Sequence, residues 1–125
     1  MHRTLLRQIK RALLLPDADA LPTLLEAARV FAQRILSEGG RDEAARIDFA
    51  FRTCLQRNPT ATEHARLQSF LQQQQHGYAH DRKAADTLVA AGPAPRPASV
   101  DTRELAAWTM VANVLFNLDE VLTKD

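Results

Sequence analysis

The sequence predicts an all-α protein, folded as a compact bundle of about five or six helices with a long, largely buried C-terminal helix. Three observations carry this prediction. Apolar residues recur at steps of three and four in successive segments, which is the spacing of amphipathic helices. Proline, glycine and capping residues separate these segments at the positions where helices start and stop. No segment shows the sustained alternation of apolar and polar residues that is typical of strands.

Length and charge narrow the class of protein further. A chain of 125 residues with 46% hydrophobic and 25% charged residues is expected to form one globular domain, residues 1–125. Its 16 Lys and Arg residues balance 15 Asp and Glu residues, so the net charge of +1 gives no strong case for nucleic-acid binding. No apolar run approaches the ~20 residues of a membrane span, and the basic N-terminus lacks the core of an export signal.

The first two predicted helices lie before Gly39-Gly40. The first covers residues 5–15 and ends at Pro16, and the second begins at Pro22, which is tolerated as a first helical residue. The apolar face of the first helix consists of Leu5, Leu6, Ile9 and Leu13, with Arg7, Lys10 and Arg11 on the other side. The stripe of the second consists of Leu24, Leu25, Ala28, Phe31, Ala32 and Ile35.

The third helix is predicted to open with Asp42 as its N-cap and to end before Asn58-Pro59. Its buried face is expected to contain Ile47, Ala50, Phe51, Cys54 and Leu55. Thr60 and Glu63 have the spacing of a capping box, which predicts the start of the fourth helix. The apolar residues of that helix are Leu67, Phe70, Leu71 and Tyr78, and we interpret its run Gln72 to Gln75 as a solvated face.

Asp81 is predicted to cap a short fifth helix that ends near Val89. Residues 92–100 are rich in proline and are expected to form an extended surface connector. Asp101 and Glu104 repeat the capping-box spacing before the last helix. Its predicted core face consists of Leu105, Trp108, Val111, Ala112, Leu115, Leu118 and Leu122.

Four polar residues interrupt the last helix: Asn113, Asn117, Asp119 and Glu120. Two amides cannot catalyse acyl transfer or hydrolysis without a nucleophile or base, and the adjacent acids point about 100° apart. We therefore interpret the four as structural residues rather than as a functional site. Asn117 is expected to bond a backbone group of the connector. One of the acids is expected to face an arginine, with Arg52 and Arg57 as the candidates.

Histidine and cysteine give weak candidates for chemistry. His76 and His80 are four residues apart and could present two imidazoles to a metal, but Gly77 lies between them and no third ligand is evident. We interpret them as solvated histidines at a helix end, and His64 as a surface histidine. Cys54 lies on an apolar stripe, which favours a small buried hydrophobe over a nucleophile. The sequence predicts no catalytic residue, no resident metal and no cofactor.

Three segments carry a family resemblance: LEAARVFAQRIL at 25–36, RIDFAFRTCLQRNPT at 46–60 and ELAAWTMVANVLFNLDEVLT at 104–123. They resemble the C-terminal part of a planctomycete-type domain of unknown function, which follows cytochrome-c-like domains in large planctomycete proteins. The resemblance covers about residues 24–125 and only loosely residues 1–20. It implies an extracytoplasmic setting but no catalytic residue. The chain lacks the cytochrome motif and most of the upstream domain, so a fragment, a truncated product and a stand-alone derivative are all open.

The functional hypothesis is accordingly a helical structural or protein-interaction module, with a protein partner or the missing upstream part of the domain as its binding partner. The first alternative is one wall of an enzyme active site that upstream regions complete. The second alternative is a small helical DNA-binding regulator, although no reading motif accompanies the arginines.

Overall fold

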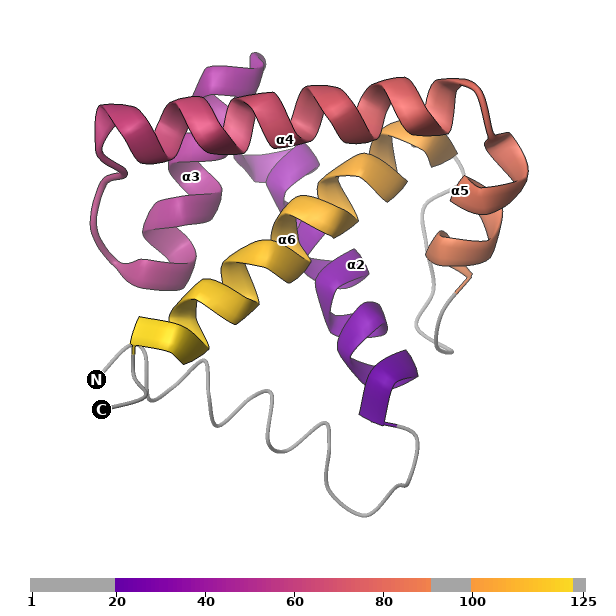
Figure 1. Cartoon of the computed structure of the whole chain (residues 1–125), viewed down its shortest axis with the longest axis horizontal. Helices are drawn as coiled ribbons and strands as arrows, with labels where there is room; N and C mark the ends of the chain where they lie inside the picture. Colours follow the sequence, from indigo (N-terminus) through magenta and orange to yellow (C-terminus); the bar gives the residue numbers. More distant parts are fainter. Residues whose placement is uncertain (1–19, 91–99, 123–125) are drawn as a thin grey trace.

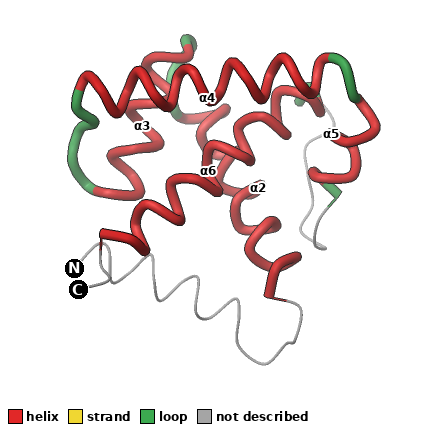
Figure 2. The backbone as a smooth tube through the Cα atoms, viewed as in Figure 1, coloured by secondary structure: helices red, strands yellow, loops and turns green. Residues whose placement is uncertain are grey.

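The structure of the chain is a computed structural model that describes residues 20–90 and 100–122, with side chains described for 24–90 and 100–118. Every regular element in these ranges is a helix, which confirms the predicted all-α class (Figures 1 and 2). The elements are α2 (Ala20–Glu38), α3 (Glu43–Leu55), α4 (Ala61–Ala79), α5 (Arg82–Val89) and α6 (Thr102–Leu122). The helix predicted over residues 5–15 and nearly all of the predicted connector lie outside the described residues.

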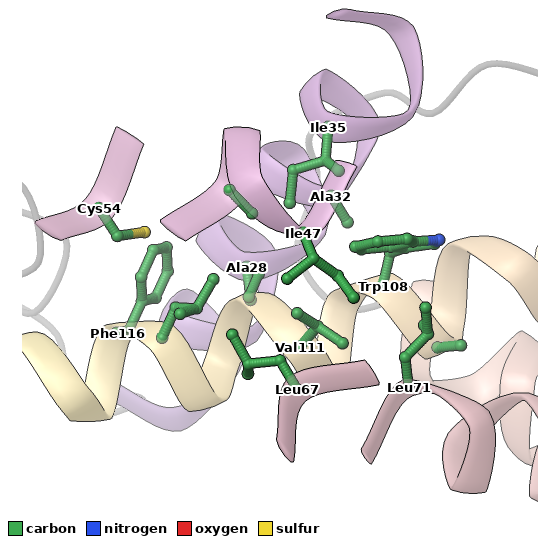
Figure 3. Close-up of a cluster of buried hydrophobic side chains, with 14 of the residues drawn as sticks. Ala28, Ala32, Ile35, Ile47, Cys54, Leu67, Leu71, Trp108, Val111 and Phe116 are labelled. Atoms are coloured by element: carbon green, nitrogen blue, oxygen red, sulfur yellow. The ribbon is translucent and has the colours of Figure 1, made fainter. Parts of the chain in front are cut away.

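Helix α6 is the element on which the described helices assemble. It packs against all four of the others and most extensively against α2, which it crosses in Figure 1. Trp108 is completely buried, and Figure 3 shows Trp108, Val111 and Phe116 of α6 among side chains from the neighbouring helices, including Ala28 and Ile47. Burying a large aromatic side chain contributes on the order of 2–3 kcal/mol to the free energy of folding. The buried side chains of α6 therefore supply a large part of the core.

The predicted core face of α3, and that of α6 except near its end, agree with the structure. The five residues predicted for α3 are all buried, as are Leu105, Trp108, Val111, Ala112 and Leu115 of α6. Leu118 was predicted in the core, but its exposed fraction is 36%. Phe116 is buried instead, and its ring stacks on Phe31 of α2 with 5.9 Å between centroids. The side chain of Leu122 lies outside the described residues.

The helix ends follow local chemistry. Asp42 Oδ1 accepts a hydrogen bond from the Ala45 amide at 2.7 Å, and Asp81 Oδ1 accepts one from the Ala84 amide at 3.0 Å. Helix α2 begins at Ala20, two residues before the predicted start at Pro22. Proline is compatible with this because the first four amides of a helix have no intrahelical acceptor. Capping residues therefore locate the starts of α3 and α5, while an uncapped start is less well determined.

The turn between α2 and α3 depends on two glycines and one arginine. Gly40 has a φ of +109°, a conformation that L side chains rarely adopt, and a Cβ at Gly39 would lie 2.6 Å from the Ile35 carbonyl oxygen. Arg46 of α3 reaches back, donating from Nε to the Gly40 carbonyl at 3.1 Å and from a terminal nitrogen to the Leu36 carbonyl at 3.3 Å. The cation thus satisfies carbonyls at the negative end of α2.

Two glycine substitutions should change stability in opposite directions. Gly40→Ala is expected to lower the free energy of unfolding by about 1–2 kcal/mol, because it forces an L residue to a positive φ. Gly77→Ala is expected to raise it by about 0.5–1 kcal/mol, because Gly77 lies within α4 and an added Cβ would meet no atom within 4 Å. Urea unfolding followed by the fluorescence of Trp108 measures both, and equal effects of the two variants would contradict this account.

Candidate functional site

The corner between α3 and α4 is held by a closed polar network. The Thr60 hydroxyl accepts from the Glu63 amide at 3.1 Å, and Glu63 Oε1 accepts from the Thr60 amide at 2.8 Å, which confirms the predicted capping box. Arg57 donates to both Glu63 carboxylate oxygens at 2.9 Å, and its guanidinium lies 4.9 Å from the centre of the Phe51 ring. These hydrogen bonds, with that of Arg57 the largest cause, lower the pKa of Glu63 to about 2.

Arg57, one of the two arginines expected to face an acid of α6, engages Glu63 in this geometry. Arg52, the other candidate, has an exposed side chain on α3. The side chains of Asp119 and Glu120 lie outside the described residues, so their pairing stays a prediction. The sequence spacing could have indicated the Arg57 pair, since Arg57 stands only six positions before Glu63.

A second polar junction joins three helices and was not predicted. Gln75 of α4 donates from Nε2 to Glu43 of α3 at 2.9 Å and to Glu104 of α6 at 2.9 Å. The interpretation of Gln72 to Gln75 as a solvated face is therefore wrong for Gln75, which is half-buried between two carboxylates. One amide nitrogen carries two hydrogens and can therefore serve two acceptors. No local sequence pattern indicates this contact, because its members are at least 29 residues apart.

The start of α6 also differs from the predicted capping box, because Glu104 bonds to a residue of another helix. Asp101 Oδ1 accepts from the Arg103 amide at 2.9 Å, whereas the expectation was a bond from the Glu104 amide. The Glu104 carboxylate accepts from Gln75 instead of bonding back to the Asp101 amide. Tertiary contact with α4 thus takes the residue that local capping would otherwise use.

The histidines take three separate roles. His64 is half-buried, with Nε2 lying 3.6 Å from an Asp48 carboxylate oxygen and 3.4 Å from the Ala44 carbonyl oxygen, so it bridges α4 to α3. His76 and His80 are exposed, with ring centroids 4.6 Å apart. His80 Nδ1 lies 3.0 Å from the His76 carbonyl oxygen, which makes Nδ1 the donor. Within residues 24–90 and 100–118, three or more His, Cys, Asp or Glu side chains gather at no point where they could hold a metal ion.

Cys54 and two threonine hydroxyls lie in structural surroundings, buried or bonded to the backbone. Cys54 is 3% exposed within the core, as predicted. The hydroxyls of Thr53 and Thr109 each donate to a backbone carbonyl four residues earlier, at 2.7 Å. Arg29, which the sequence analysis did not single out, is completely buried on α2 and donates to Gln33 at 2.7 Å. These contacts are those of structural side chains.

The remaining candidate is a surface on α6, which we name the α6 strip. It consists of Met110, Asn113, Val114, Asn117 and Leu118, which are half-buried or exposed at helical positions i, i+3, i+4, i+7 and i+8. Within the described part of the chain, the side chains of Asn113 and Asn117 make no hydrogen bond. The expected bond from Asn117 to the connector involves residues outside that part. The strip lies within a run of fourteen uncharged residues, from Leu105 to Leu118.

Comparisons with models of protein families, with curated proteins and with solved structures found no match to this chain. Among the described helices, none has both the length and the apolar content needed to cross a bilayer.

The Glu63 network should make stability depend on acid pH. A carboxyl with a lowered folded-state pKa stabilises the protein above its unfolded pKa, near 4.5, and this contribution is lost as pH falls toward about 2. Glu63→Gln is expected to lower the free energy of unfolding by about 1 kcal/mol at neutral pH, because it weakens the cap. The variant should also lose less stability than the wild type as pH falls between these two values. Urea unfolding at several pH values measures this. An unchanged acid dependence would show that Glu63 is not the group responsible.

Replacing Gln75 by glutamate tests the three-helix junction with almost no change of shape. Gln75→Glu removes the donor that both carboxylates share and places three acids together, so the free energy of unfolding should fall by about 1–3 kcal/mol at neutral pH. It should recover partly below pH ~4.5, as a protonated acid donates again. Gln73→Glu, at an exposed position of α4, is the control and should change stability by less than about 0.5 kcal/mol.

Proposed function

We propose that this chain is a non-catalytic helical structural or protein-interaction module whose α6 strip binds a polypeptide segment. The observation that carries the proposal is the chemistry of the strip: three apolar side chains and two amides that make no hydrogen bond within the described part of the chain, in a run that contains no charged residue. Binding surfaces have this composition, since charged residues are depleted from the centres of interfaces.

The contrast with neighbouring surfaces supports the proposal. Arg34 and Glu38 form an ion pair on the exposed side of α2, and α3 exposes Arg52. Such residues keep a helix surface solvated. The strip instead offers exposed Leu118, beside half-buried Val114 that also packs against the core, for apolar contact. The amides of Asn113 and Asn117 are its donors and acceptors. An amide beside an apolar side chain can donate and accept hydrogen bonds within an interface.

The alternatives draw less support from the described residues. An enzyme wall would be expected to present unpaired acids, whereas Glu43, Glu63 and Glu104 each accept hydrogen bonds from a neighbouring side chain. A DNA-binding surface would need clustered cations, whereas Arg34 and Arg57 are each paired with a glutamate. The resemblance to the C-terminal end of the planctomycete-type domain stays a prediction, and an interaction module is consistent with it.

A photo-cross-linking residue placed at position 117 tests the proposal. Benzoylphenylalanine in place of exposed Asn117 should form a defined cross-link to a polypeptide segment, because the segment that covers the strip lies within reach of the ketone. The same residue in place of Gln73, exposed on α4, is the matched control. Irradiation of the purified full chain and of the cells that produce it, followed by peptide mass mapping, identifies the products. Equal yields from positions 117 and 73 in both settings would reject the strip as an interaction surface.

A further inference from the structure

Helix α4 ends with two exposed histidines, His76 and His80, whose rings lie close together. We propose that these two imidazoles chelate a copper(II) ion, with water in the other coordination positions. The site belongs to a different helix from the α6 strip and goes beyond the proposed function. It stands whether or not the strip binds a polypeptide.

The helix brings both imidazoles to the same side. Residues four positions apart on an α-helix lie on one face, one above the other. Gly77, which lies between the two histidines, does not interrupt the helix, because α4 continues to Ala79 and His80 is its C-cap residue. The ring centroids of His76 and His80 consequently lie 4.6 Å apart.

This separation fits one metal ion bound by both rings. A metal bonded to a ring nitrogen at about 2.1 Å lies about 3.2 Å from the centre of that ring. Two rings that meet at the metal at about 90° would have centroids about 4.5 Å apart, and at a tetrahedral angle about 5.2 Å apart. The observed 4.6 Å matches the first case, which is the geometry of neighbouring ligands in a tetragonal site. Tetragonal sites with nitrogen and oxygen ligands favour copper(II) and nickel(II), and copper(II) binds more tightly.

A hydrogen bond prepares the ring of His80 for a metal. Its Nδ1 donates to the His76 carbonyl oxygen at 3.0 Å, so Nε2 keeps the lone pair that a metal needs. Histidines that bind metals commonly donate their other ring N–H to a backbone carbonyl, which fixes the tautomer and the ring orientation. Within the described ranges, no hydrogen bond engages either ring nitrogen of His76. Both rings can therefore offer a nitrogen without losing a contact that the fold uses.

The surroundings of the pair admit a cation and water. The last carbonyls of a helix carry partial negative charge, which attracts cations. Asp81 follows His80 and adds a carboxylate, while Arg82 and Lys83 of α5 have exposed side chains whose charge solvent and salt screen. Since the two histidines are exposed as well, water has access to the remaining coordination positions.

A titration of the full chain with copper(II) chloride, followed by the NMR signals of the histidine rings, tests the chelate. Paramagnetic copper(II) broadens the signals of the rings that it binds. The signals of His76 and His80 should broaden together. In His76→Gln, the His80 signal should need at least about tenfold more copper(II), because the second imidazole no longer joins an ion that is already bound. His2→Gln removes the histidine next to the N-terminal amine, another copper ligand, and should leave the response of the pair unchanged.

An exchange of one histidine with one glutamine is the matched control. The double variant with His76→Gln and Gln73→His keeps the number of imidazoles and uses two exposed positions of α4. Its histidines are seven residues apart, or ~10.5 Å along the helix, so one ion cannot reach both rings. The affinity for copper(II) should therefore fall at least about tenfold, to that of His76→Gln.

Urea unfolding provides a second measurement, because only the folded helix holds the two imidazoles together. Copper(II) should raise the urea midpoint of the wild type more than that of the exchanged variant. Equal copper(II) requirements of the wild type and the exchanged variant in the NMR titration, or equal shifts of their urea midpoints, would overturn the chelate in favour of separate solvated histidines. Either result would leave the cross-linking test of the α6 strip unaffected, so the two proposals fail separately.

Discussion

The burial of α6 is the constraint on which the rest of the described fold depends. Trp108 is fully buried in the first half of this helix, and each of the other described helices packs against α6. The indole Nε1–H has no hydrogen-bond acceptor within the described residues. An unsatisfied buried donor costs on the order of 1–3 kcal/mol, so the apolar burial of the ring must outweigh that cost. The protein therefore uses Trp108 mainly as a large hydrophobe.

Polar side chains complete the assembly by fixing where the helices meet. Arg46 ties α3 to the end of α2, Glu63 ties α4 to the residues after α3, and Gln75 joins α4 to α3 and α6. In each case a hydrogen bond specifies one geometry among the several that apolar packing alone would permit. These contacts explain why so many of the polar residues in the described helices have structural partners.

The α6 strip stands apart from this pattern. One side of α6 builds the core, and the opposite side carries apolar and amide groups where other helices carry charges. A helix that is uncharged on all sides over fourteen residues is typical of an element covered on all sides.

The sequence by itself determined the all-α class, the core face of α3 and the capped starts of α3, α4 and α5, because helical periodicity and capping depend on residues within a few positions of one another. Tertiary structure decided the partner of Gln75, the diversion of Glu104 from its cap and the exchange of Leu118 for Phe116 in the core. Each depends on a neighbour far along the chain, such as Phe31 for Phe116, and on the angle at which two helices cross. Local spacing carries no information about that angle.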